Sequence, residues 1–459
     1  MNRFNTSTNH QIIPNSNNYM YEQHYVSIHS NDRDLHKFPK SSEFEIEIPQ
    51  DYLNVVSVRL HSWSMPSNYN VFSIQNYNII MTFQLSTLYD PININVGTGI
   101  GDFLDASYQA TSNAFYQALK YNQDKNYAPI IEEGFYNPEQ IAVELTNKFN
   151  DVINNTINNF LNLPNAIDYF SNPTYYTIAK EIYDNRYLFD DNLKYLYNRF
   201  IIVYNTVNQK LWFGNKADKF ILTNDTIEKE ELDNYNLNCL RKNFLPNAAD
   251  WGLPCNLGFT RCPVTSITTE ESYKLKKTYD PPFIADNLIY EPYPRFFYGD
   301  VLISGDKGYW LLPDDSCPGS IVYYIQPPYK INFMGPSYIY MEIEGLNCFD
   351  ETSPYNISPF TIKTNQTNGV VNSAFAKIAL YSTPITQFYD QVTEPYKYFS
   401  PPAERIRKIK VKLRYHDGQT IDFGVFDYSF MLEFNLLRPQ NLRGQNIQNS
   451  FDLSQMQNK

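Results

Sequence analysis

The chain has 459 residues, more than one ordinary hydrophobic core contains, so we expect one large domain with insertions or two domains. Hydrophobic residues make up 42% and charged residues 19%, proportions that exclude an intrinsically disordered chain. The formal net charge of −12 argues against nucleic acid as a direct partner, because phosphate binding relies on excess Lys and Arg. Aromatic residues make up 16%, mostly Tyr and Phe, which favour strands. The leading fold class is therefore all-β.

The sequence also bears on cellular location. No apolar run approaches the roughly 18 residues that a membrane span requires, so no transmembrane segment is expected. Residues 1–19 lack the charged and apolar regions of a secretory signal. The five cysteines are an odd number without a C-x-x-C spacing. We therefore expect free thiols in a reducing compartment rather than a disulfide framework or a zinc site.

The N-terminal part is expected to consist of strands. In one of them, Phe44, Ile46 and Ile48 alternate with three glutamates, which predicts one buried and one solvated face. Pro49 is expected to end that strand. Residues 86–130 lack any periodicity and are interpreted as an insertion or a long loop. The predicted strands cover residues 25–29, 43–48, 55–63 and 79–85.

A helix is predicted over residues 138–154. Asn137 supplies an N-cap, Pro138 occupies the first helical position, and Gln140 can complete a capping box. The Asn-rich residues 154–165 are interpreted as a connector. Apolar side chains at helical spacing define the buried stripe: Ile141, Leu145, Phe149 and Val152.

Strands resume after the helix. Residues 200–204 and 210–213 bracket a short polar turn, which predicts a hairpin. Near the C-terminus, apolar and basic residues alternate before an Asp417-Gly418 turn, which predicts a second hairpin with a buried inner face. Strands are expected over 338–344, 375–381, 408–415 and 428–434.

That second hairpin contains the chain's one cationic cluster. Alternation with apolar residues places the cluster on the outer face of a strand. A solvated face is one interpretation, and contact with an acidic partner surface is the other. The cluster comprises Arg405, Arg407, Lys408, Lys410, Lys412 and Arg414.

No catalytic, cofactor-binding or metal-binding residue is predicted from the sequence. The acidic pairs Glu132-Glu133 and Asp314-Asp315 could act as acid and nucleophile in a glycosidase, but adjacent carboxylates in loops are usually just solvated. Residues 96–101 are glycine-rich but lack the lysine of a phosphate-binding loop. We therefore expect a protein that is not an enzyme. The six histidines are isolated from one another and from Cys: His10, His24, His29, His36, His61 and His416.

The domain boundary is placed near residue 264. It separates β-rich halves at 21–264 and 265–443, with the alternative that both halves complete one sandwich. Residues 1–20 and 444–459 are polar and bury too little apolar area to offset the cost of ordering. They are expected to be arms that become ordered on neighbouring subunits.

Several short segments occur in a recognisable order. The first strand is followed by SNDRD at 30–34, FP at 38–39, SSEFEI at 41–46 and NVVSVRL at 54–60. Later segments are EGFYNPEQI at 133–141, LGF at 257–259, AFAKI at 374–378 and the Asp417-Gly418 turn. This order resembles the virion and minor capsid proteins of nucleocytoplasmic large DNA viruses, the giant viruses. Long inserts at 86–130, 155–198 and 265–335 depart from the family's pattern.

The resemblance implies a jelly-roll type antiparallel β-sandwich with helical and loop insertions and polar terminal arms. It also implies a virion structural role, assembly in host cytoplasm, and no catalytic residues. A minor capsid protein that links major capsid subunits or stabilises a vertex is the leading interpretation. Its partners would be the major capsid protein, neighbouring minor capsid proteins and possible further copies of itself. The alternative is a lectin-like or glycan-active jelly roll on a virion surface or fibre, motivated by the aromatic residues and acidic pairs.

Overall fold

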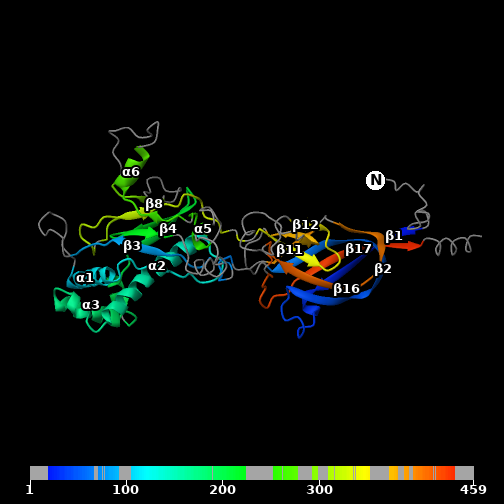
Figure 1. The fold of residues 1–459 in the computed structure, drawn as a ribbon, viewed down its shortest axis with the longest axis horizontal. Helices are drawn as coiled ribbons and strands as arrows, with labels where there is room; N and C mark the ends of the chain where they lie inside the picture. The colour runs from blue at the N-terminus through cyan, green and yellow to red at the C-terminus, as the bar shows by residue number, and fades with distance from the viewer. Residues whose placement is uncertain are drawn as a thin grey trace, which may run out of the picture. The chain divides into compact units, whose positions relative to one another are not determined.

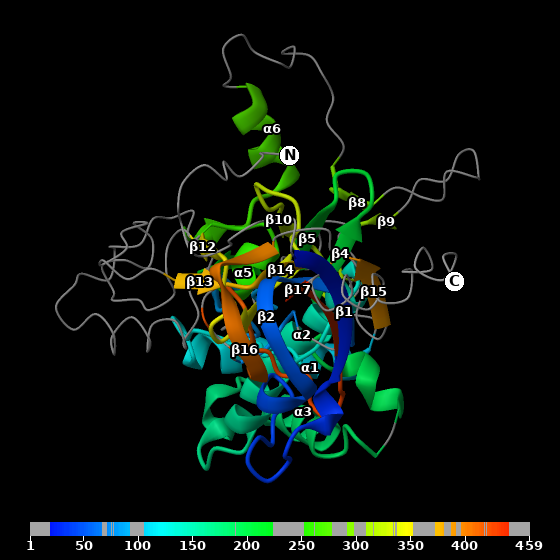
Figure 2. The ribbon, with the colours of Figure 1, turned by 90° about the vertical axis from the view of Figure 1, so that its right-hand side faces the viewer.

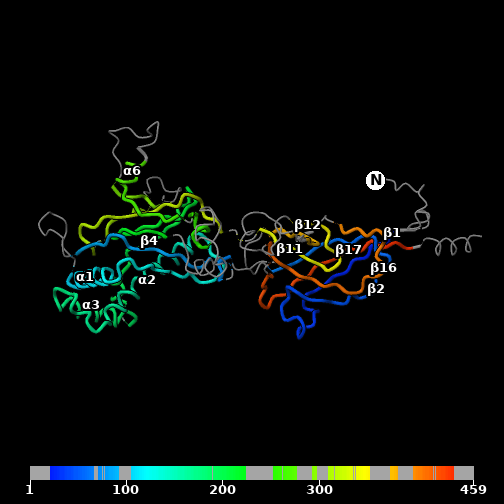
Figure 3. Tube along the Cα trace, in the orientation of Figure 1, coloured from blue at the N-terminus to red at the C-terminus, as the bar shows by residue number. Residues whose placement is uncertain are grey.

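The computed structural model divides the chain into two compact units (Figures 1 and 3). Met1–Tyr69 and Pro336–Lys459 form the terminal unit, and Asn70–Gly335 form the central unit inserted between them. The boundary predicted near residue 264 therefore lies inside the central unit. The structure describes residues 19–66, 71–91 without 75 and 77, 105–223 without 189, 252–277 without 261, 292–297, 309–335 without 315 and 334, 337–351, 372–380, 387–391, and 396–439 without 417 and 419.

The terminal unit is built on one antiparallel sheet that curls around its core. Its strand order is β1-β17-β2-β16-β11-β14, and β15 pairs with one end of β2. Figure 2 shows the long strands β1, β2 and β16 of this sheet. The strands are β1 (Tyr19–His29), β2 (Glu43–Pro66), β11 (Tyr338–Ile343), β14 (Ala376–Ala379), β15 (Gln387–Gln391), β16 (Tyr396–Arg414) and β17 (Ser429–Pro439), beside a hairpin of β12 (Phe349–Glu351) and β13 (Asn372–Ala374).

The predicted alternation in β2 is confirmed, because Phe44 and Ile48 are buried in the core while the intervening glutamates face solvent. Pro49 does not end the strand. The register of β16 against β2 shifts between Ile406 and Lys408, so the residues around Pro49 form an irregularity where a missing N–H is tolerated. Two predicted strands are therefore one strand of 24 residues. Side chains from Phe44 to Met65 along this strand belong to the hydrophobic core of the terminal unit.

The first and last strands of the terminal unit are neighbours in the sheet. β1 pairs with β17 along its full length, from His29 opposite Ser429 to Tyr19 opposite Pro439. The segments that precede Tyr19 and follow Pro439 therefore start from neighbouring positions at one end of the sheet. The predicted arms, residues 1–20 and 444–459, lie outside the described residues except for the start of β1.

The central unit combines helices with small antiparallel sheets. The sheet orders are β10-β5-β4, β3-β6-β7 and β8-β9. Its helices are α1 (Ala106–Tyr121), α2 (Pro138–Leu161), α3 (Pro173–Asp184), α5 (Leu253–Asn256) and α6 (Thr269–Lys277), with the short 3-10 helices η3 (Ala166–Tyr169) and η4 (Asp190–Tyr195). Its strands are β3 (Phe83–Thr87), β4 (Phe200–Asn205), β5 (Lys210–Asn215), β6 (Lys219–Leu222), β7 (Val264–Thr265), β8 (Arg295–Phe297), β9 (Tyr309–Trp310) and β10 (Tyr323–Ile325). The terminal unit also has a short 3-10 helix, η2 (Ser30–Asp32). Both units contain antiparallel sheets, which agrees with the predicted all-β class. The jelly-roll sandwich stays a prediction.

Helix α2 begins as predicted and covers a sheet edge. Asn137 and Gln140 form the capping box. Further along, Thr146 and Asn150 hydrogen-bond to backbone groups of β4, the edge strand of its sheet: the Asn150 side chain accepts from the Phe200 N–H at 3.0 Å and donates to its carbonyl at 2.9 Å. Polar side chains spaced by one helical turn thus satisfy backbone groups that another strand would otherwise pair.

Asn154 continues this pattern and should be important for stability. Its Nδ2 donates to the Tyr197 carbonyl at 2.9 Å, and its Oδ1 accepts from the Tyr197 N–H at 2.9 Å and the Tyr183 hydroxyl at 2.8 Å. We expect Asn154→Ala to lower the free energy of unfolding by about 2–4 kcal/mol, since each buried group left unpaired costs about 1–3 kcal/mol. Asn155→Ala, at an exposed position of the same helix, is the control. Equal effects in urea denaturation would contradict this role.

Three local predictions are corrected. Residues 86–130 contain α1, whose buried face combines Phe115 and Leu119 with small residues such as Ala110, Ala114 and Ala118, so the sequence shows only a weak apolar periodicity there. The predicted Asn-rich connector at 154–165 is mostly the last part of α2, which ends at Leu161. The predicted final hairpin is reduced to one antiparallel bridge between Arg414 and Thr420. Strands β16 and β17 do not pair with each other, because β2 lies between them.

Candidate interaction surfaces

The outer face of the terminal sheet carries a cross-strand row of aromatic and charged side chains. The register places Tyr25 beside Glu433, Glu433 beside Arg59, and Arg59 beside Tyr396. Directly opposed residues on neighbouring strands share a face of the sheet, so the four side chains form one row. The next residue of β1, Val26, points into the core.

Glu433 is the centre of this row. It is buried, and its Oε2 accepts from Arg59 Nη2 at 2.6 Å and Nε at 2.9 Å. Its Oε1 accepts from Asn435 at 3.3 Å and Gln23 at 3.5 Å, and His61 Nδ1 lies 3.8 Å from Oε2. A two-point guanidinium–carboxylate pair holds both side chains in fixed positions. The row therefore has a rigid and locally neutral centre.

Tyrosines surround this centre. The Tyr25 ring contacts His61 edge-on at 5.0 Å between centroids, the Arg59 guanidinium lies 4.8 Å from the Tyr396 ring, and Tyr396 stacks with Tyr398 at 5.6 Å. We call this surface the tyrosine face: Tyr21, Tyr25, Tyr396 and Tyr398. Tyr21, Tyr25 and Tyr398 are 64%, 50% and 68% exposed. Tyrosines with few rotatable bonds offer large contact area at a small entropic cost, which suits protein or glycan recognition.

The predicted cationic cluster meets acidic residues of its own sheet. The register pairs Lys408 with Glu47 and Lys410 with Glu45, so the glutamates of β2 and the basic residues of β16 share one face. Lys408 Nζ lies 3.4 Å from carboxylates of both Glu45 and Glu47. The cluster is therefore largely compensated within the chain. Other pairs are Arg405–Asp51 at 2.8 Å, Arg407–Glu47 at 3.6 Å and Lys410–Glu43 at 3.6 Å.

Arg414, the last residue of the cluster, has a different environment. It is fully buried and binds Glu342 of β11 and Glu351 of β12. His416 Nδ1 lies 3.0 Å from Glu351 Oε2, and the Arg414 guanidinium lies 5.0 Å from the Tyr340 ring. This buried cluster fastens the β12–β13 hairpin to the main sheet.

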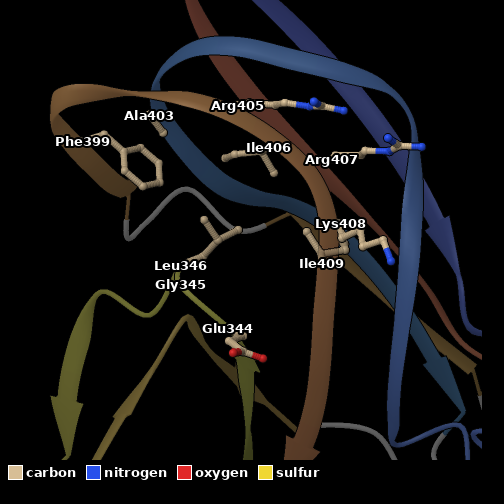
Figure 4. Close-up of a pocket in the computed structure, with 10 residues that line it drawn as sticks. All are labelled: Glu344, Gly345, Leu346, Phe399, Ala403, Arg405, Ile406, Arg407, Lys408 and Ile409. Carbon is tan, nitrogen blue, oxygen red and sulfur yellow. The ribbon is translucent and has the colours of Figure 1, made fainter.

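An open hollow of about 630 Å³ lies beside β16, and both apolar and charged residues line it (Figure 4). Phe399, Ala403, Ile406 and Leu346 form its apolar part. Its charged lining residues are Glu344, Arg405, Arg407 and Lys408. Phe399, Ala403 and Ile406 are only partly buried, so solvent reaches the hollow. It has the volume typical of a pocket for small ligands or for a few side chains.

The central unit contains a second buried charge pair. Asp218 Oδ2 accepts from Arg199 Nη1 and from the Tyr197 hydroxyl, both at 2.9 Å. Burial raises the pKa of Tyr197 well above its usual range, and the Asp218 carboxylate adds to the effect. The thiol of Cys317 is also buried here, and burial raises its pKa. The rings of Tyr89, Phe115 and Tyr197 lie 5.2–5.4 Å from the Arg199 guanidinium.

The acidic residues singled out in the sequence serve local structure. Glu133 Oε1 accepts from the Ile74 N–H at 2.6 Å, and Asp314 Oδ1 accepts from the N–H and hydroxyl of Ser316. Asp315 and residues 96–101 lie outside the described residues. Over the described ranges, no three His, Cys, Asp or Glu side chains are arranged to hold a metal ion. None of the described helices is long and apolar enough to cross a membrane.

Comparisons with known proteins give likenesses in structure but none in sequence. No family model matches the chain, and no curated protein matches it in sequence. The chain is similar to a chain in the structure of the Sputnik virophage determined by cryo-electron microscopy at 3.5 Å resolution. The two are 12% identical with a TM-score of 0.33, over 93% of this chain and 99% of that chain.

Proposed function

We propose that the protein is a non-enzymatic structural component of a virion, more specifically a minor capsid protein that links major capsid subunits or stabilises a vertex. The observation that carries the proposal is the tyrosine face, where exposed rings lie around the Arg59–Glu433 ion pair, whose carboxylate is buried. A rigid surface of this kind can bind another protein without a large ordering cost. The order of sequence segments given above supports the viral setting.

The positions of Tyr19 and Pro439 add to this proposal. Because they are paired, two polar segments start from one end of the terminal sheet and could engage the same neighbouring subunit. Two linked attachments strengthen binding through effective concentration. The proposed partners are the major capsid protein, neighbouring minor capsid proteins and further copies of this chain, assembled in host cytoplasm and retained in the virion.

Incorporation into particles tests the proposal. A tagged copy produced during infection should be found by mass spectrometry in purified virions, and Tyr25→Ser/Tyr398→Ser should reduce its incorporation by roughly tenfold or more. Tyr187→Ser, at an 83% exposed tyrosine of the central unit, is the matched control and should be incorporated normally. Recovery of the wild-type protein from infected cells but never from particles would refute the virion role.

A glycan-binding function is the second candidate. The stacked Tyr396 and Tyr398 rings lie on the face that also carries the amides of Gln23 and Asn435, a combination suited to sugar rings and hydroxyls. Under this alternative, the purified chain binds members of a glycan array and Tyr398→Ser abolishes the signal. An array without hits would remove this candidate.

A further inference from the structure

The outer edge of strand β1 is open over the described part of the chain. β1 lies at one end of the terminal sheet, and its pairing there is with β17 alone. That pairing covers all 11 residues of β1 without a register shift. One side of a long and regular strand therefore presents backbone N–H and C=O groups that no described strand pairs.

Other sheet edges of this chain are protected. Side chains of α2 hydrogen-bond to the backbone of β4, and β14, at the opposite end of the terminal sheet, has only four residues. Edge strands are commonly protected by Pro, Lys, a bulge or short length. β1, with the sequence YMYEQHYVSIH, has none of these features. An unprotected edge of this length favours the addition of another strand.

Hydrogen-bond alternation shows which backbone groups of β1 face the open edge. Just after β1, the Ser30 N–H donates to the Tyr428 carbonyl at 2.9 Å, which continues the register of β1 with β17. In an antiparallel ladder, successive residues direct their backbone groups to opposite sides. The N–H and C=O groups of the odd-numbered residues, from Tyr21 to Ser27, therefore face the open edge.

The sequence of β1 is complementary to itself in one antiparallel register. A two-fold axis at Gln23 places this residue opposite its own copy and Tyr21 opposite Tyr25 of the second copy. Odd-numbered residues are then paired with odd-numbered residues, as the groups at the open edge require. Both tyrosines are exposed in the single chain, so the register forms two aromatic cross-strand pairs from exposed rings.

Charge favours this register over its neighbours. Glu22 pairs with Arg438 of β17, and its Oε1 lies 3.0 Å from His24 Nε2. With the axis at Gln23, Glu22 lies opposite His24 of the second copy, and this pair occurs twice. An axis at Glu22 would place two carboxylates directly opposite each other, which is destabilising. An axis at His24 would place Glu22 opposite the apolar Val26.

We propose that two copies of this chain pair through the open edges of β1, antiparallel and with the two-fold axis at Gln23. The contact joins the two terminal sheets and uses the same surface on both copies, so it closes at a dimer. It also brings the two tyrosine faces side by side, because Tyr21 and Tyr25 belong to that face. The inference rests on the proposed assembly role and specifies a second copy as one partner.

Sedimentation equilibrium of the purified full-length protein measures this contact. The wild type should change from monomer to dimer as its concentration rises and should grow no further. Gln23→Lys places two ammonium groups opposite each other at the axis and should raise the dissociation constant by roughly tenfold or more. Asn435→Lys is the matched control, because Asn435 pairs with Gln23 on the neighbouring strand β17, one strand away from the edge. It should dimerise like the wild type, and circular dichroism confirms that both variants fold.

Disulfide trapping tests the register. In the proposed pairing the two Gln23 Cα atoms lie about 5.5 Å apart, which a disulfide can bridge. Gln23→Cys should therefore form a covalent dimer on mild oxidation, and mass spectrometry should identify the peptide joined at position 23. Ser27→Cys is the control, because the two copies of Ser27 would be separated by eight residues along the strand, about 27 Å.

Three results would each overturn the inference: a wild type that stays monomeric, a Gln23→Lys variant that dimerises as well as Asn435→Lys, or equal crosslinking at positions 23 and 27. Each of these results would leave the virion proposal open, because that proposal is tested by particle incorporation.

Discussion

Asp218→Ala should lower the free energy of unfolding of the central unit by about 3–5 kcal/mol, because it leaves a buried guanidinium without its counter-ion. Asp218 and Arg199 are 0% and 2% exposed. Besides the 2.9 Å contact with Arg199, Asp218 Oδ1 accepts from the Tyr89 N–H at 2.8 Å. Without the carboxylate, the Arg199 charge is surrounded by three aromatic rings, which cannot replace an anion.

Hydrogen exchange followed by mass spectrometry is the appropriate measurement, because a chain with two units need not unfold in one step. In Asp218→Ala, the protection of backbone amides from exchange should fall in peptides of Asn70–Gly335 and stay unchanged in peptides of the terminal unit. Asp184→Ala is the control, because it removes an exposed carboxylate that lies 3.7 Å from Lys180. It should lower the free energy of unfolding by less than about 1 kcal/mol. The double variant Arg199→Met/Asp218→Leu should recover part of the loss. If Asp218→Ala lowered the free energy of unfolding by less than about 1 kcal/mol, the buried Arg199–Asp218 pair would not have the importance for stability expected here.

Arg414→Met should destabilise the terminal unit by a similar amount, about 3–5 kcal/mol. The substitution keeps an unbranched apolar side chain but removes the guanidinium that binds Glu342 and Glu351. Glu351 is only 2% exposed, so its carboxylate would lose its buried cationic partner in a place that water does not reach. Because the three residues come from β16, β11 and β12, the loss should loosen the contact between the β12–β13 hairpin and the sheet.

Arg407→Met is the matched control for this prediction. It is the same substitution on the same strand, but Arg407 is 54% exposed and its partner Glu47 lies at 3.6 Å. We expect Arg407→Met to lower the free energy of unfolding by less than about 1 kcal/mol. The midpoint of urea denaturation and hydrogen exchange in the terminal unit would report both variants. Similar effects of the two substitutions would show that burial of Arg414 has no energetic importance.

Sequence periodicity predicted the elements whose signals are local. The alternation around Phe44 and the capping box at Asn137 depend on residues within a few positions of each other, and both are found in the structure. Helix α1 was not predicted because only two large apolar residues, Phe115 and Leu119, lie among the small and polar residues of its buried face. The strand end predicted at Pro49 was wrong because the pairing of β2 with β16 is irregular around Pro49 and accommodates the proline.

The candidate surfaces depend on contacts that sequence spacing does not encode. Tyr25 and Glu433 are 408 positions apart, yet they are direct neighbours in the sheet. The alternation of Tyr21, Gln23 and Tyr25 was a usable signal for an aromatic outer face, but nothing local relates it to Arg59 or Tyr398.

The sequence by itself determined that this chain folds, that antiparallel strands are its main component, and where several of them lie, because side-chain alternation is set by neighbouring residues. Only the tertiary structure decided that the central unit is an insertion, that the basic strand is compensated by Glu45 and Glu47, and that Arg199 and Arg414 are buried. The physical reason is that strand pairing and charge burial join residues from distant parts of the chain. The energies of these contacts depend on which residues are neighbours in space, and local sequence patterns do not specify those neighbours.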